Sequence, residues 1–309
     1  MGTRVLPRAG RLRQALPAAP GGGPVSTPPA YGTSCVAHHV PGERSRLGTL
    51  EAAFDPVTTR VLDGLDLPET AVCLELGAGA GSVAAWLAAH RPHGRVVATD
   101  TDTRFLRFAP TAPVRVLRHD VVTEDFPPAS FDLVHARALL SHLPDRDRVL
   151  RRAARWVRPG GRLVVEDLTV EPVDDSAHPL LRQVTRAGEE LLRATVGTDL
   201  RWARALPERL RDAGLHDVRS LSTPGTVGDG SPADAFWTAT FEQAVPAHLA
   251  TGSLRAEDVE AVRALHRTPG FTATAVAMVT AWGTRPRPLK TATAAPRRPF
   301  RPTDKEKPL

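Results

Sequence analysis

Short apolar segments alternate with longer segments of helical periodicity along most of this chain. Each apolar run is only a few residues long and rich in valine and leucine, which predicts a strand that is buried on both faces. Strands separated by helices form a parallel sheet with helices on both faces. In the first half the expected strands span 71–76, 95–100, 114–120, 131–135 and 162–166. The pattern therefore predicts an α/β fold, Rossmann-like and doubly wound.

The helices are predicted from their apolar spacing and their start signals. In the same half they are expected over 44–54, 56–65, 81–89, 102–109, 137–143 and 145–157. Asp55 is expected to cap the second of these, because an acid directly before a proline is a common helix start. From residue 172 onward, helices are expected over 179–196, 200–212, 233–249 and 256–267, with strands near 218–221 and over 271–282. We expect the late helices to cover the open end of the sheet, where ligands of such folds bind.

A glycine-rich turn follows the first predicted strand. In Glu75-Leu-Gly-Ala-Gly-Ala-Gly81, three alternate glycines run directly into the next helix. Glycines permit a tight turn and a close approach of the backbone to a ligand, and the free N–H groups of the helix start point at the same place. The turn therefore predicts nucleotide binding. Counted from Gly79 to Ala84 it also fits the dinucleotide pattern, so an NAD(P)-dependent oxidoreductase is an alternative.

Three acidic residues end successive predicted strands. Glu75 closes the first, and its charge would oppose the pyrophosphate of a dinucleotide but suits a cofactor that carries an ammonium and a sulfonium. Asp100 closes the second, at the position expected for a residue that binds ribose hydroxyls. Asp120 closes the third, where the amino group of an adenine could donate a hydrogen bond. Because the three acids end successive strands, they predict a single binding crevice at that end of the sheet.

Composition divides the chain into four parts. Residues 1–40 are rich in Pro, Gly and Ala and predict a disordered leader, and residues 285–309 predict a basic disordered tail. Between them, 41–171 would form a helical lid and the cofactor-binding Rossmann-like core. Residues 172–284 would form a helical cap and the final strands of the same domain.

The positive charge of the chain lies in its ends. Residues 1–30 contribute +4 and residues 285–309 contribute +6, so the formal charge of +6 leaves −4 for residues 31–284. A mildly acidic body argues against nucleic acid as a partner. The two cysteines form no disulfide framework and no metal-ligand pattern, and no apolar stretch approaches the roughly 20 residues of a membrane span. We therefore expect a cytoplasmic protein without a metal and without membrane attachment; a homodimer remains open.

The segments 43–47, 50–55 and 281–286 resemble actinobacterial small-molecule members of the class I S-adenosylmethionine-dependent methyltransferases, and five further segments in order resemble the motifs of that class. These five span 72–81, 96–100, 119–120, 131–137 and 158–166. The resemblance implies a seven-stranded sheet with an antiparallel last strand and S-adenosyl-L-methionine as the cofactor. It implies methyl transfer by direct in-line displacement to a small-molecule acceptor, with secondary metabolites among the candidates. A protein or RNA methyltransferase and a non-catalytic cofactor-binding protein remain alternatives.

The resemblance also implies individual roles. The residues expected near the cofactor are, at its methionine end, Glu75, Gly77, Ala78, Gly79, Gly81, Ala136 and Arg137; at its ribose, Asp100, Thr101 and Asp102; and at its adenine, Asp120 and Val121. For Arg137 the alternative is that it only anchors the next helix.

Two histidines are candidate catalytic residues. His135 and His142 flank the expected methionine end, and a general base is needed if the acceptor is a hydroxyl. The alternative for each is a packed or hydrogen-bonded histidine without a catalytic role. Aromatic residues of the late helices are expected to recognise the acceptor: Trp202, Phe236, Trp237 and Phe241.

Overall fold

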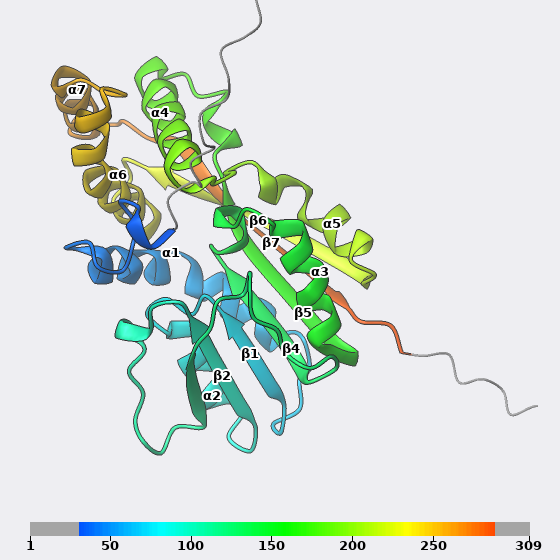
Figure 1. Cartoon of the computed structure of the whole chain (residues 1–309). Helices are drawn as coiled ribbons and strands as arrows, with labels where there is room; N and C mark the ends of the chain where they lie inside the picture. Colours follow the sequence, from blue (N-terminus) through cyan, green and yellow to red (C-terminus); the bar gives the residue numbers. More distant parts are fainter. Residues whose placement is uncertain (1–30, 288–309) are drawn as a thin grey trace, which may run out of the picture.

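The computed structural model describes residues 31–287 (Figure 1). Residues 1–30 and 288–309, and with them most of the predicted leader and tail, lie outside the described residues. Residues 31–40 are folded, rather than part of a leader that extends to residue 40. They begin with a 3₁₀ helix, Tyr31–Thr33, and the side chains of Val36 and Ala37 are buried.

The centre of the fold is a seven-stranded sheet in the order β3-β2-β1-β4-β5-β7-β6. β7 runs antiparallel to both of its neighbours, and the other pairs are parallel. The strands are β1 Val72–Leu76, β2 Arg95–Asp100, β3 Val114–Arg118, β4 Phe131–Arg137, β5 Val157–Thr169, β6 His216–Val227 and β7 Ala273–Thr284. The predicted Rossmann-like sheet with an antiparallel last strand is therefore confirmed. Its strand order reverses between β1 and β4, the position at which such folds open a crevice.

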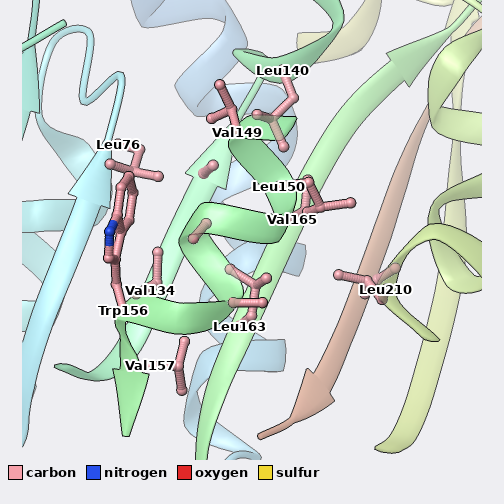
Figure 2. Close-up of a cluster of buried hydrophobic side chains, with 14 of the residues drawn as sticks. Leu76, Val134, Leu140, Val149, Leu150, Trp156, Val157, Leu163, Val165 and Leu210 are labelled. Carbon is pink, nitrogen blue, oxygen red and sulfur yellow. The ribbon is translucent and has the colours of Figure 1, made fainter. Parts of the chain in front are cut away.

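Helices cover both faces of the sheet. The main helices are α1 Glu43–Asp63, α2 Ser82–His90, α3 Arg146–Trp156, α4 Pro179–Val196, α5 Leu206–Asp212, α6 Pro232–Thr251 and α7 Ala256–His266. On one face, Leu62 of α1 and Leu87 of α2 share a buried cluster with Cys73 and Leu133. On the other face, α3 packs Leu150 and Trp156 against the residues labelled on β4 and β5 in Figure 2.

Several predicted helices differ from the observed ones. Residues 102–109 form only a 3₁₀ turn, Thr103–Phe105, and Pro110 disfavours helical backbone in the residue before it. Residues 137–143 form only the 3₁₀ turn Leu140–His142, because β4 continues to Arg137 and Ala138 has a positive φ of 49°. The helix predicted over 200–212 is divided into a 3₁₀ turn, Trp202–Ala205, and α5.

The two helices predicted over 44–65 are one continuous helix, α1, with Pro56 inside it. The prediction that Asp55 caps a second helix is therefore wrong. Its carboxylate instead pairs with Arg137 of β4 at 2.8 Å and accepts a hydrogen bond from Ser82 of α2 at 3.1 Å. Asp55 therefore connects α1 to β4 and α2 and does not begin a helix.

Helices α4, α6 and α7 form a cap at one end of the sheet (Figure 1). A second buried cluster joins Val184 of α4, Phe241 of α6 and Val259 of α7 to Ala275 of β7. The cap also meets α1, because the ring of Phe54 packs edge-on against Phe236 at 6.0 Å. Within residues 31–287, no helix is long and apolar enough to cross a membrane.

Candidate functional site

The glycine turn after β1 leaves an opening at its middle glycine. Gly79 has a φ of +57°, and a Cβ added there would meet nothing closer than 3.8 Å. Its N–H donates to Asp100 Oδ2 at the end of β2, at 3.0 Å, and Asp100 Oδ1 accepts from the N–H of Asp102 at 3.1 Å. The carboxylate of Asp100 therefore fixes the turn from the neighbouring strand.

A cavity of about 280 Å³ lies at the carboxyl ends of the strands, walled by α1, α4 and α6. Its polar part is lined by residues of the strand ends and the turn. Nine of the twelve predicted cofactor residues line it: Glu75, Gly77, Ala78, Gly79, Asp100, Thr101, Asp120, Val121 and Arg137. The structure thus brings together the three acids that end successive strands.

Three predicted cofactor residues do not line this cavity. Gly81 begins α2 with a φ of +93°, and a Cβ there would lie 2.9 Å from Phe108 Cζ, so packing accounts for this glycine. Asp102 directs its carboxylate to Arg104, with an N–O distance of 2.8 Å. Ala136 is buried among the residues between the sheet and α3. The roles predicted for these three residues are not retained.

Asp120 also organises the loop after β3. Its Oδ1 accepts from the N–H of Val122 at 2.8 Å, and its Oδ2 accepts from Thr123 Oγ1 at 2.9 Å. These bonds hold the carboxylate and the adjacent backbone of Val121 at the edge of the cavity.

Arg137 connects β4 to two helices that precede it in the chain, and not to the next helix as the alternative interpretation expected. Besides its ion pair with Asp55, its guanidinium donates to Thr58 Oγ1 at 3.0 Å and to Ser82 Oγ at 3.3 Å. It therefore ties β4 to both α1 and the start of α2, and it lines the cavity as well.

His135 is fully buried and does not line the cavity. Its Nδ1 lies 2.7 Å from Glu75 Oε2, and its Nε2 lies 3.1 Å from Glu166 Oε2. Burial disfavours the imidazolium, but the two carboxylates outweigh burial and raise the pKa of His135 to about 9. Because both ring nitrogens are engaged, His135 is not retained as a general base.

His142 does line the cavity. Its Nδ1 lies 3.0 Å from Thr198 Oγ1, and its ring packs at 5.1 Å from the ring of Tyr31. Burial, together with the positive charges of Arg46 and Arg146, lowers the pKa of His142 to about 4. The imidazole is therefore neutral at physiological pH, the form in which a histidine can accept a proton.

A buried acid next to His142 was not predicted. Asp167 of β5 accepts hydrogen bonds from the N–H of Ser141 at 3.0 Å and from its Oγ at 2.7 Å, and it lines the cavity. Burial raises its pKa to about 6, against these hydrogen bonds. The available signal was its place directly after the predicted strand 162–166, which matches the positions of Asp100 and Asp120.

The remainder of the cavity wall is mainly apolar and comes from helices. Phe236, Trp237 and Phe241 line it, as predicted for the late helices, but Trp202 does not. The indole of Trp202 donates to Asp147 at 3.0 Å below the cap, and it is buried. The wall residues missed by sequence reasoning include Leu47, Leu50, Val184, Leu191, Leu192 and, from the predicted leader, Tyr31, Cys35, Val36 and His38.

Residues 74–165 match the family model described as a methyltransferase domain. A 27-O-demethylrifamycin SV methyltransferase of Amycolatopsis mediterranei is 31% identical over 193 residues, which cover 57% of this chain and 67% of that protein. An uncharacterized methyltransferase of Mycobacterium tuberculosis is 39% identical over 109 residues, which cover 34% of this chain and 54% of that protein. The chain thus spans about half the length of the first curated relatives that it matches.

The fold has solved counterparts. The YcgJ protein of Bacillus subtilis superposes with a TM-score of 0.50 at 17% identity, covering 74% of this chain and 97% of that one. A putative methyltransferase of Haloferax volcanii, solved with the Trm112 methyltransferase activator, also has a TM-score of 0.50, at 17% identity, covering 79% and 94%. At 17% sequence identity, the similarity to these two structures is a similarity of fold alone.

Proposed function

The chain belongs to the class I S-adenosylmethionine-dependent methyltransferases, and from this premise we propose that it methylates a small, largely apolar acceptor. The observation that carries the proposal is a continuous cavity in which a polar part, formed by strand ends, adjoins an apolar part formed by α4 and α6. Donor and acceptor would occupy these two parts.

The residues of the polar part fit the methyl donor. Gly79 leaves space at the turn, which a Cβ would narrow. Glu75 offers a carboxylate to the ammonium group of the donor, and Asp100 offers one to its ribose hydroxyls. Asp120 and the backbone of Val121 suit an adenine. S-Adenosylmethionine supplies a methyl group already activated on a sulfonium.

The protein's own contribution would be alignment and the exclusion of water. Orientation of two reactants can account for roughly 7–11 kcal/mol of a barrier. α1, α4 and α6 enclose the cavity, and the 3₁₀ turn that begins at Tyr31 closes against His142. For a hydroxyl acceptor, neutral His142 is the cavity residue that would take the proton.

The acceptor class follows from the lining. Aliphatic and aromatic side chains form most of the helical wall, which favours an apolar molecule with few polar groups. The relative in A. mediterranei is named for a small molecule, 27-O-demethylrifamycin SV, and this supports a small acceptor and transfer to oxygen. A secondary metabolite is the acceptor that we propose.

The proposal is tested in two steps on the full chain. Calorimetry should detect binding of S-adenosylmethionine and S-adenosylhomocysteine. Release of S-adenosylhomocysteine is then measured with a panel of apolar alcohols and phenols, and separately with RNA and with peptides. Turnover with members of the first panel is expected. Methyl transfer to RNA or peptides alone, or binding of NAD(P)H without binding of the sulfonium donor, would overturn the proposal.

A further inference from the structure

Two glutamates and a histidine form a continuous row across three adjacent strands. Glu75 on β1, His135 on β4 and Glu166 on β5 are at most 3% exposed, and the imidazole bridges the two carboxylates at 2.7 and 3.1 Å. Only Glu75 of the three lines the cavity. The row therefore leads from the cofactor crevice into the interior of the sheet.

The contacts of Glu166 and His135 indicate the charges of these two members. Glu166 Oε2 also accepts from Thr58 Oγ1 at 2.6 Å, and Oε1 accepts from Thr280 Oγ1 at 2.7 Å. A carboxylate that accepts on both oxygens is ionised, and its pKa is lowered: despite burial, the bonds and charge of His135 hold it down. The two carboxylates raise the pKa of His135 to about 9, so the ring is an imidazolium at neutral pH and donates from Nδ1 toward Glu75 and from Nε2 toward Glu166.

Further charged groups lie beside the row. Arg137 follows on β4 and contacts Thr58, and Asp55 on α1 pairs with Arg137. With His135 protonated, the three carboxylates of Asp55, Glu75 and Glu166 face two cations. One negative charge is in excess, and Glu75 presents it to the cavity. Without the imidazolium, the buried carboxylates of Glu75 and Glu166 would lose the cation that lies between them and the hydrogen bonds that orient them.

We propose that His135 is a positioning residue that fixes the carboxylate of Glu75 toward the ammonium group of the methyl donor. The inference rests on the proposed function, because it assumes that the amino-acid end of the donor lies at Glu75. His135 touches neither donor nor acceptor. Its effect is therefore confined to ligands that carry the amino-acid end.

The first test is calorimetry at pH 7 with two probes, S-adenosylhomocysteine and 5′-methylthioadenosine, which lacks the amino-acid end. His135→Gln should weaken S-adenosylhomocysteine binding at least tenfold and leave 5′-methylthioadenosine binding within twofold. The control is His216→Gln, because His216 pairs with Asp217 at 2.7 Å on the surface. Equal affinity of His135→Gln and wild type for S-adenosylhomocysteine would overturn the inference alone. Failure of the wild type to bind either probe would overturn the proposed function.

A second variant covers the case in which His135→Gln does not fold. Because its pKa is raised, the imidazolium is present below about pH 9 and is lost as the pH rises through that value. S-Adenosylhomocysteine affinity of the wild type should fall through the same range. Glu166→Gln removes one of the two carboxylates that stabilise the imidazolium. The affinity of this variant for S-adenosylhomocysteine should therefore fall at a lower pH than that of the wild type, while its affinity at pH 6 should stay within threefold of the wild type. The amino group of the ligand titrates identically with both proteins. Identical pH profiles for wild type and Glu166→Gln would overturn the inference.

Discussion

Asp100 and Asp102 lie two residues apart, and only Asp100 lines the cavity. We expect Asp100→Ala to weaken S-adenosylhomocysteine binding at least tenfold, because hydrogen bonds to a charged group contribute about 1.5–3 kcal/mol. Asp102→Ala removes a carboxylate of the same loop that pairs with Arg104, and it should bind within twofold of wild type. Calorimetry measures both. Unchanged affinity of Asp100→Ala would mean that the ribose binds elsewhere.

His142 makes the folded protein sensitive to acid. Its pKa of about 4 lies below the ordinary value of 6.5, so the unfolded chain takes up the proton first and stability is lost as the pH falls from about 6.5 toward 4. The loss from this residue amounts to about 2–3 kcal/mol at most near pH 4.5. In His142→Gln the free energy of unfolding in urea should therefore fall less between pH 7 and pH 4.5 than in wild type. An equal fall in both proteins would contradict an imidazole that stays neutral in the folded protein.

Among the site residues, those tied to a local motif could be predicted from sequence. Glu75, Gly79, Asp100 and Asp120 each end or follow a strand, and the carboxyl ends of parallel strands meet at one edge. His135 could be located in this way but not interpreted. Its function depends on Glu166, which lies 31 residues further along the chain.

At the scale of elements, helix α2 depends on the glycine that begins it. Gly81→Ala should lower the free energy of unfolding by about 1–2 kcal/mol for the left-handed backbone and by about 1–3 kcal/mol more for the contact with Phe108. Gly252 at the end of α6 is the control, because its φ is +70° and a Cβ there would meet nothing within 4 Å. Gly252→Ala should lower the free energy of unfolding only by the cost of the left-handed backbone. Equal losses in urea unfolding would argue against the packing role of Gly81.

The boundaries of helices were predictable where the local sequence carries start and stop residues. α4 spans the predicted 179–196, with a proline at its first residue and Gly197 in left-handed conformation after its last. α1 was not predictable as one helix, because its continuity past Pro56 depends on partners elsewhere in the fold. These are Arg137 for Asp55 and Glu166 for Thr58.

At the scale of the whole molecule, a buried ion pair joins α1 to the cap. Arg46 donates to both carboxylate oxygens of Glu43, at 2.7 and 2.8 Å, and Gln243 of α6 donates to the same carboxylate at 2.6 Å. Arg46→Met leaves the Glu43 charge buried without its partner and should lower the free energy of unfolding by about 3–5 kcal/mol.

The matched control for that prediction is the double variant Glu43→Gln with Arg46→Met. It removes both charges and should lose less stability than Arg46→Met alone. Urea unfolding of the two proteins decides between the alternatives. A larger loss in the double variant would mean that Glu43 is stabilised by other groups.

The apolar part of the cavity required the complete fold. Its walls combine residues 31–38, α1, α4 and α6, segments that no local pattern places side by side. The sequence predicted that aromatic residues of the late helices contact the acceptor. It could not separate Phe241, which faces the cavity, from Trp202, which packs beneath the cap.

The two parts of the cavity are built from different elements: strand ends supply one, and cap helices supply the other. Substitutions in α4 or α6 can therefore change which molecule is modified while the donor pocket stays intact. Relatives with new acceptor specificities on this scaffold would differ mainly in the sequences of those two helices. Laboratory evolution toward a chosen product would begin with libraries at their inward-facing positions.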